Sequence, residues 1–179
     1  MMKHFFITLL YLFCINPAYA QGFSSTISDA EIESVILSAL QVESGKREGK
    51  IKVERSIVDW KEILNVNIDS FQNINDGVDP DVGGIQELFT EADYDYFRLQ
   101  IKLQKRFDWT LPGKSIKIVA DCSHECYRYA LPLFNVSRNV AIIYKEEIYS
   151  SMAACGIISA YTLINNQWEL SKSILVWLM

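Results

Sequence analysis

The sequence predicts an α+β domain in which two helices of the N-terminal half pack on a C-terminal antiparallel β-meander of about five strands. Apolar residues recur at helical spacing in two segments before residue 105, and the period changes to two near residue 115. The later apolar segments follow one another with only short turns between them, which is typical of antiparallel strands rather than of βαβ units. Helices followed by a run of strands are characteristic of the α+β class.

The first 20 residues have the pattern of a secretory signal peptide. Lys3 gives a positive start, residues 5–15 are a run without charge that is apolar except for Thr8, and Ala18-Tyr19-Ala20 is a small-x-small cleavage site. The apolar run is shorter than the roughly 20 residues that a membrane-spanning helix needs. We therefore expect cleavage after Ala20 and a single exported domain, residues 21–179, that is periplasmic or extracellular and has no transmembrane segment.

The charge of the chain limits the kinds of partner that we expect it to bind. The chain of 179 residues has 22 acidic and 17 basic residues and a formal net charge of −5. Nucleic acids and anionic membranes are bound by basic faces, so this balance argues against both. We expect no nucleic-acid partner and no cofactor.

Residues 28–44 form the first predicted helix. Ser28 can cap it, with Glu31 three residues later to close a capping box, and Gly45 is placed to end it. The apolar residues that repeat at helical spacing are Ile32, Val35, Ile36 and Leu40.

Three further segments precede the predicted sheet. Residues 49–60 alternate between apolar and polar, which predicts a strand with one solvated face. Residues 65–84 are rich in Asn, Asp, Gly and Pro and predict a long loop. Residues 90–104 predict the second helix, in which Thr90 is the cap and Asp93 closes the box.

The C-terminal part predicts strands at the following ranges: 115–120, 129–136, 139–150, 154–164 and 168–177. This part resembles small exported bacterial proteins of uncharacterised function, which share a Pro-x-Phe strand, a Val-Ala strand, a Cys-Gly strand and an Asn-x-x-Trp turn. The matching residues are Pro132, Phe134, Val140, Ala141, Cys155, Gly156 and, in the turn Asn165-Asn166-Gln167-Trp168, Asn166 and Trp168. The helix segment LFTEADYDYFRLQ is also similar. The resemblance implies export and a sheet-building role, and it implies no activity.

The stretch DCSHECYRY, residues 121–129, holds the candidate chemistry. After cleavage the cysteines are Cys122, Cys126 and Cys155, and the histidine is His124. A zinc site made of all four is one alternative, although three ligands along a strand would spread over about 13 Å. A Cys122–Cys126 pair is another, possible on a helical turn but not on a strand.

We predict instead a disulfide between Cys126 and Cys155, with Cys122 as the alternative partner of Cys155. Both preferred cysteines lie in or beside apolar strands, and a bridge that closes about 30 residues stabilises a fold by roughly 3 kcal/mol. Cys122, between Asp121 and Ser123, is then the free thiol. We expect no metal.

The sequence contains no recognised catalytic motif, and we expect no catalytic residues. The first functional hypothesis is therefore an exported non-catalytic domain that binds a protein or a cell-envelope component. The alternative is a secreted hydrolase that uses acidic residues in a pocket at the mouth of the sheet. A filled core with an exposed aromatic face would favour binding, whereas a deep cavity with two close carboxylates would favour the enzyme.

Overall fold

The computed structural model describes residues 27–45, 50–63, 84–103, 107, 109 and 116–179. The predicted signal peptide lies outside the described residues, as does the predicted loop over 65–84 except for Gly84. None of the described helices is long and apolar enough to cross a membrane.

Both predicted helices are present. Helix α2 (Asp29–Ser44) begins at Ser28, whose hydroxyl accepts from the Glu31 amide at 3.3 Å while its amide donates to the Glu31 carboxylate at 2.9 Å. Helix α5 (Glu91–Leu103) begins after Thr90, whose amide donates to Asp93 at 2.8 Å. The described residues between them include two short helices, α3 (Trp60–Ile63) and the 3-10 helix η2 (Ile85–Leu88).

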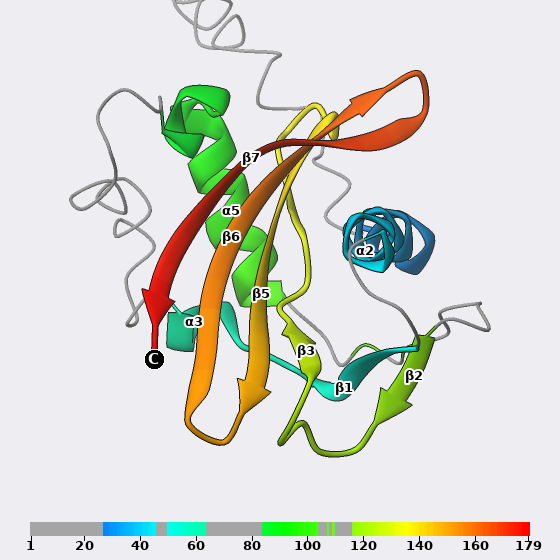
Figure 1. Cartoon of the computed structure of the whole chain (residues 1–179). Helices are drawn as coiled ribbons and strands as arrows, with labels where there is room; N and C mark the ends of the chain where they lie inside the picture. The colour runs from blue at the N-terminus through cyan, green and yellow to red at the C-terminus, as the bar shows by residue number, and fades with distance from the viewer. Residues whose placement is uncertain (1–26, 46–49, 64–83, 104–106, 108, 110–115) are drawn as a thin grey trace, which may run out of the picture.

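A mixed sheet of seven strands forms the centre of the molecule (Figure 1). Its strands are β1 (Ile51–Ile57), β2 (Ile116–Val119), β3 (Cys126–Tyr129), β4 (Leu133–Phe134), β5 (Val140–Ser150), β6 (Ala153–Ile164) and β7 (Gln167–Leu178). Their order across the sheet is β2-β1-β3-β5-β6-β7, and β4 pairs with β5 outside this path.

The prediction of an antiparallel meander is wrong for one half of the sheet. Strands β5, β6 and β7 do form the predicted antiparallel series. Strand β1, however, is inserted between β2 and β3 and pairs with both in parallel. The alternation of residues 51–57 reveals a strand, but it carries no information about partners that follow more than 60 residues later in the chain.

The sheet separates two cores. On one face α2 packs over β1, β3 and β5, and the central side chains there include Val35, Ile36, Val53 and Ile143. On the other face α3 and α5 pack over β5 and β6, with Trp60, Phe97, Ile142 and Ile158 at the centre. Figure 1 shows α5 behind the sheet and α2 on the other side. Successive residues of β5 therefore point into different cores, as expected for a strand that is buried on both faces.

Gly156 of β6 leaves room for an aromatic side chain from the last strand. A Cβ atom at this position would lie 2.3 Å from Trp177 Nε1 and 2.7 Å from the Tyr144 hydroxyl, which is closer than real Cβ contacts come. The Trp177 indole lies over the glycine and donates to the Tyr144 hydroxyl at 2.9 Å.

We predict that Gly156→Ala lowers the free energy of unfolding by about 1–3 kcal/mol, because the new methyl group displaces Trp177. The matched control is Gly45→Ala. Gly45 has φ −67° and its Cβ would meet nothing nearer than 3.8 Å, so stability should stay the same or rise. Urea unfolding of both variants checks this, and equal effects would contradict it.

Candidate functional site

The DCSHECYRY segment forms a closed loop. Cys122 and Cys126 are joined by a disulfide with a Cα–Cα separation of 5.8 Å. The loop residue Glu125 has φ 46°, a left-handed conformation that turns the chain back toward the start of β3. Two of its side chains, those of His124 and Glu125, are exposed and lie 3.9 Å apart. A turn therefore brings together two cysteines that an extended strand would hold apart.

The predicted Cys126–Cys155 disulfide is wrong, and Cys155 is a buried free cysteine. Strand β5 lies between the two, so their backbones are separated by two strand spacings, or about 9.6 Å. Cys126 is in register with Ile148, which is in register with Ala154, so the next residue, Cys155, points to the opposite face. The same placement excludes the alternative Cys122–Cys155 pairing and separates Cys155 from the other three candidate zinc ligands, Cys122, His124 and Cys126.

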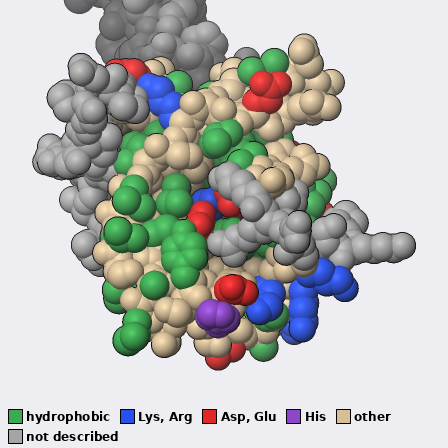
Figure 2. Space-filling model, in the orientation of Figure 1, with side chains coloured by type: hydrophobic (Ala, Val, Ile, Leu, Met, Phe, Trp, Pro, Cys, Tyr) green, Lys and Arg blue, Asp and Glu red, His purple; other side chains and the backbone are tan. Residues whose placement is uncertain are grey.

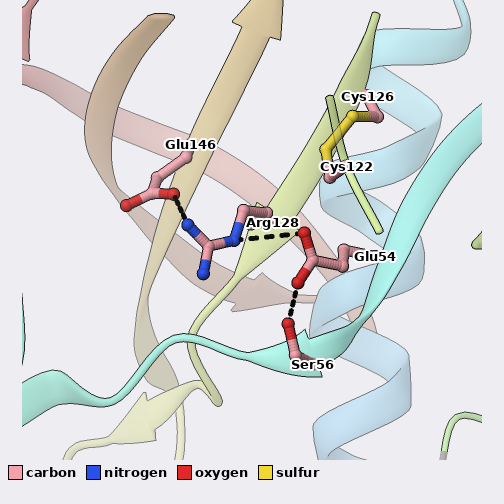
Figure 3. Close-up of a disulfide and its surroundings, with 6 residues drawn as sticks. All are labelled: Glu54, Ser56, Cys122, Cys126, Arg128 and Glu146. Carbon is pink, nitrogen blue, oxygen red and sulfur yellow. Dashed lines mark hydrogen bonds and ion pairs between the residues drawn. A yellow bond between two sulfur atoms is a disulfide. The ribbon is translucent and has the colours of Figure 1, made fainter. Parts of the chain in front are cut away.

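A polar row crosses the α5 face of the sheet beside the disulfide (Figure 3). Arg128 of β3 stands between two carboxylates, with Nη1 2.8 Å from Glu146 of β5 and Nε 3.3 Å from Glu54 of β1. The hydroxyl of Ser56 donates to the other oxygen of Glu54. Figure 3 shows these side chains and the disulfide on the same side of the strands, away from α2.

The row continues to the last strand. The Tyr144 hydroxyl donates to Glu146 at 3.0 Å and accepts from Trp177, so hydrogen bonds and ion pairs connect β1 with β7. Burial and the Glu146 carboxylate raise the pKa of the Tyr144 hydroxyl well above its usual value. The carboxylates of Glu54 and Glu146 are bound by other side chains of the sheet, so this row is a structural network.

A second polar cluster lies on the opposite face, under α2. The Lys145 ammonium of β5 is 2.6 Å from Glu43 of α2 and 2.6 Å from Glu147. All three side chains are almost fully buried. Tyr127 donates to Glu43 at 3.3 Å, and Tyr149 donates to Glu147 at 2.7 Å.

This cluster contains the two close carboxylates that the hydrolase alternative requires, but their arrangement does not suit acid catalysis. A general acid must carry the proton that it transfers. Glu43 and Glu147 both accept from the same ammonium, which compensates their charge and holds them as a structural unit. In Figure 2 basic and acidic atoms appear together in a hollow of the face opposite α5, surrounded by hydrophobic atoms.

The structure reveals an apolar surface that the sequence analysis missed. It is formed by the β5–β6 turn and the last residues of β7, which are joined by hydrogen bonds between Ala154 and Met179 at 2.9 and 3.1 Å. Its side chains are between 41% and 83% exposed. They are Tyr149, Met152, Leu175, Leu178 and Met179, and we call this set the apolar end.

No charged residue occurs in 148–158 or in 173–179, the two segments that form the apolar end. The period-two pattern of these two segments predicts strands, but it does not indicate which side of each strand other elements cover. Helix α2 covers β1, β3 and β5, and it meets β7 near the start of that strand, where Trp168 donates to Ser34 at 3.0 Å. Among the described elements, none therefore covers the far end of β7 on this face.

We predict that peptide mapping under non-reducing conditions will find Cys122 linked to Cys126, and Cys155 as a thiol. Because Cys155 is buried, it should react with an alkylating agent only after the protein is unfolded. Recovery of any peptide in which Cys155 is disulfide-bonded would contradict this arrangement.

Two buried tyrosines should respond to loss of their hydroxyl groups with opposite signs. The Tyr129 hydroxyl is buried and has no hydrogen-bond partner among the described residues. Burial and the nearby Glu43 raise its pKa well above the usual value. An unsatisfied buried hydroxyl costs about 1–3 kcal/mol, so Tyr129→Phe should raise the free energy of unfolding by about 1 kcal/mol.

Tyr144→Phe is the matched control. It removes the bonds to Glu146 and Trp177 and should lower the free energy of unfolding by about 1–2 kcal/mol. Urea unfolding at neutral pH measures both changes. A loss of stability in Tyr129→Phe would show that its hydroxyl has a partner after all, such as a buried water.

Comparison with known proteins gives no relative from which a role can be transferred. No protein-family model, curated protein or solved structure matches the chain significantly.

Proposed function

We propose that this chain is an exported, non-catalytic domain that binds a protein or a cell-envelope component through its apolar end. The supporting observation is the concentration of exposed large apolar side chains where the β5–β6 turn meets the end of β7. Met152, at 83% exposed, and Leu178, at 73%, are nearly as accessible as in an extended chain. Clusters of this kind, as opposed to single exposed apolar residues, are characteristic of interaction sites.

The edge of the sheet strengthens this proposal. Among the described strands β7 has a neighbour on one side only, β6, and it is 12 residues long. Edge strands are usually protected by charges, prolines or bulges that prevent pairing with other chains. The last seven residues of the chain, 173–179, contain no charge and no proline, and the protective feature present there is the register shift between Leu175 and Trp177. Apart from that irregularity, this part of the edge is open to a partner that the apolar side chains hold in place.

The hydrolase alternative has weaker support. Its best pair of carboxylates, Glu43 and Glu147, is bridged by Lys145, and the other close pair, Glu54 and Glu146, is bridged by Arg128. In each pair a cation occupies the position between the carboxylates where a substrate would have to bind.

A photocrosslinking amino acid placed at Met152 tests the proposal in the cells that make the protein. We expect adducts from this position and none from the same amino acid at Val136, an exposed apolar residue in the turn before β5. The mass of the adduct distinguishes a protein partner from a lipid. Equal or absent crosslinking at the two positions would refute binding through the apolar end.

A further inference from the structure

The parallel pairing of β1 with β2 creates a basic face that the sequence does not reveal. Lys52 and Lys117 are directly in register. Side chains in register on neighbouring strands project from the same face, and Lys50, two residues before Lys52, projects with them. We call these three residues the lysine face. Figure 2 shows Lys and Arg side chains gathered on the side of the molecule where β1 and β2 lie in Figure 1.

The lysines of this face have no acidic partners among the described residues. The nearest acid on the same side of β1, Glu54, is engaged by Arg128 and Ser56. Like charges placed opposite each other on neighbouring strands destabilise a sheet. Lysines on edge strands often prevent pairing with other chains, and this role would explain Lys117 on β2. The same role does not explain Lys52, because β1 lies inside the sheet between β2 and β3.

The strand registers place the lysine face and the apolar end at the same end of the sheet. Val53 is in register with Tyr127, so Lys52 lies beside Cys126. Cys126 is in register with Ile148, and Ile148 with Ala154, which exchanges hydrogen bonds with Met179. One row of residues therefore leads from Lys117 on β2 to Met179 after β7.

We propose that this end of the molecule docks on a lipid bilayer that carries anionic headgroups. The proposal rests on the proposed function and specifies its partner. The lysine face contacts the phosphates, while Met152, Leu178 and Met179 enter the boundary between headgroups and acyl chains. Peripheral proteins are held stably when an apolar contribution and a basic contribution act together. The net charge of −5 directs the rest of the molecule away from an anionic surface.

The disulfide loop lies between the two contributing surfaces. It carries His124 and Glu125, and Asp121 directly precedes it, so the two acids offset part of the attraction of the lysines. We therefore expect neither surface to be sufficient alone. This proposal departs from the expectation from net charge that anionic membranes are excluded, because Lys52 and Lys117 are separated in the sequence and become neighbours only in the sheet.

Vesicle flotation tests the proposal with the exported protein, after its mass has established that residues 1–20 are absent. We expect binding to vesicles of equal parts phosphatidylglycerol and phosphatidylcholine, and weak binding to phosphatidylcholine alone. Each lysine near an anionic surface contributes a factor of about five, so Lys52→Gln with Lys117→Gln should weaken binding by about 25-fold. Leu178→Ser with Met179→Ser should weaken it by more than about tenfold.

Two control pairs of substitutions remove the same number of positive charges, or two apolar side chains, from other surfaces of the molecule. Lys61→Gln with Lys102→Gln, and Leu103→Ser with Val136→Ser, alter exposed residues of other surfaces and should leave binding unchanged. Equal binding to both vesicle types, or equal losses in the control pairs, would overturn the lipid assignment. If the protein does not bind vesicles but forms a protein adduct at Met152, the lipid assignment is wrong and the proposed function still stands. If it neither binds vesicles nor forms an adduct at Met152, both proposals are wrong.

Discussion

The ion cluster at Lys145 holds α2 against the sheet. Its ammonium is 2.6 Å from a carboxylate of α2 and 2.6 Å from a carboxylate of its own strand, and all three groups are almost excluded from water. Removing charges from water costs several kcal/mol for each ion, and only close geometry with further hydrogen bonds compensates this cost. Tyr127 and Tyr149 supply such bonds to Glu43 and Glu147. The position of α2 in turn determines which part of this face the described elements cover, and the end of β7 lies outside that part.

Elements that depend on nearby residues could be predicted from the sequence. The capping pairs Ser28–Glu31 and Thr90–Asp93 mark the helix starts, because both partners lie within one turn. The antiparallel series β5–β6–β7 follows from alternation and short turns, one of which uses Asn165 and Asn166 at φ 49° and 62°. These features are local in the chain, and the fold class follows from them.

Features that depend on distant residues could not be predicted in the same way. The insertion of β1 between β2 and β3 is a property of the assembled sheet, and residues 51–57 show only that they form a strand. The predicted Cys126–Cys155 disulfide is wrong because it rests on the apolar strands around both cysteines, which place each near the core but do not give the distance between them, whereas a turn with Glu125 in a left-handed conformation brings Cys122 back to Cys126. The apolar end was missed because periodicity reports which face of a strand is apolar and not whether another element covers it. The polar clusters at Arg128 and Lys145 likewise join side chains from different strands and helices.

The parallel position of β1 also constrains the order in which the chain can fold. Its two neighbours among the described strands, β2 and β3, follow it by a long interval, so β1 cannot pair with either of them until they have been synthesised. Contacts between residues far apart in the sequence carry a high entropic cost of loop closure and form slowly. The hairpins of β5, β6 and β7 have low contact order and can form first. We therefore expect the C-terminal strands to supply the template on which β1 is arranged, so that the sheet is completed only when nearly all of the chain has been made.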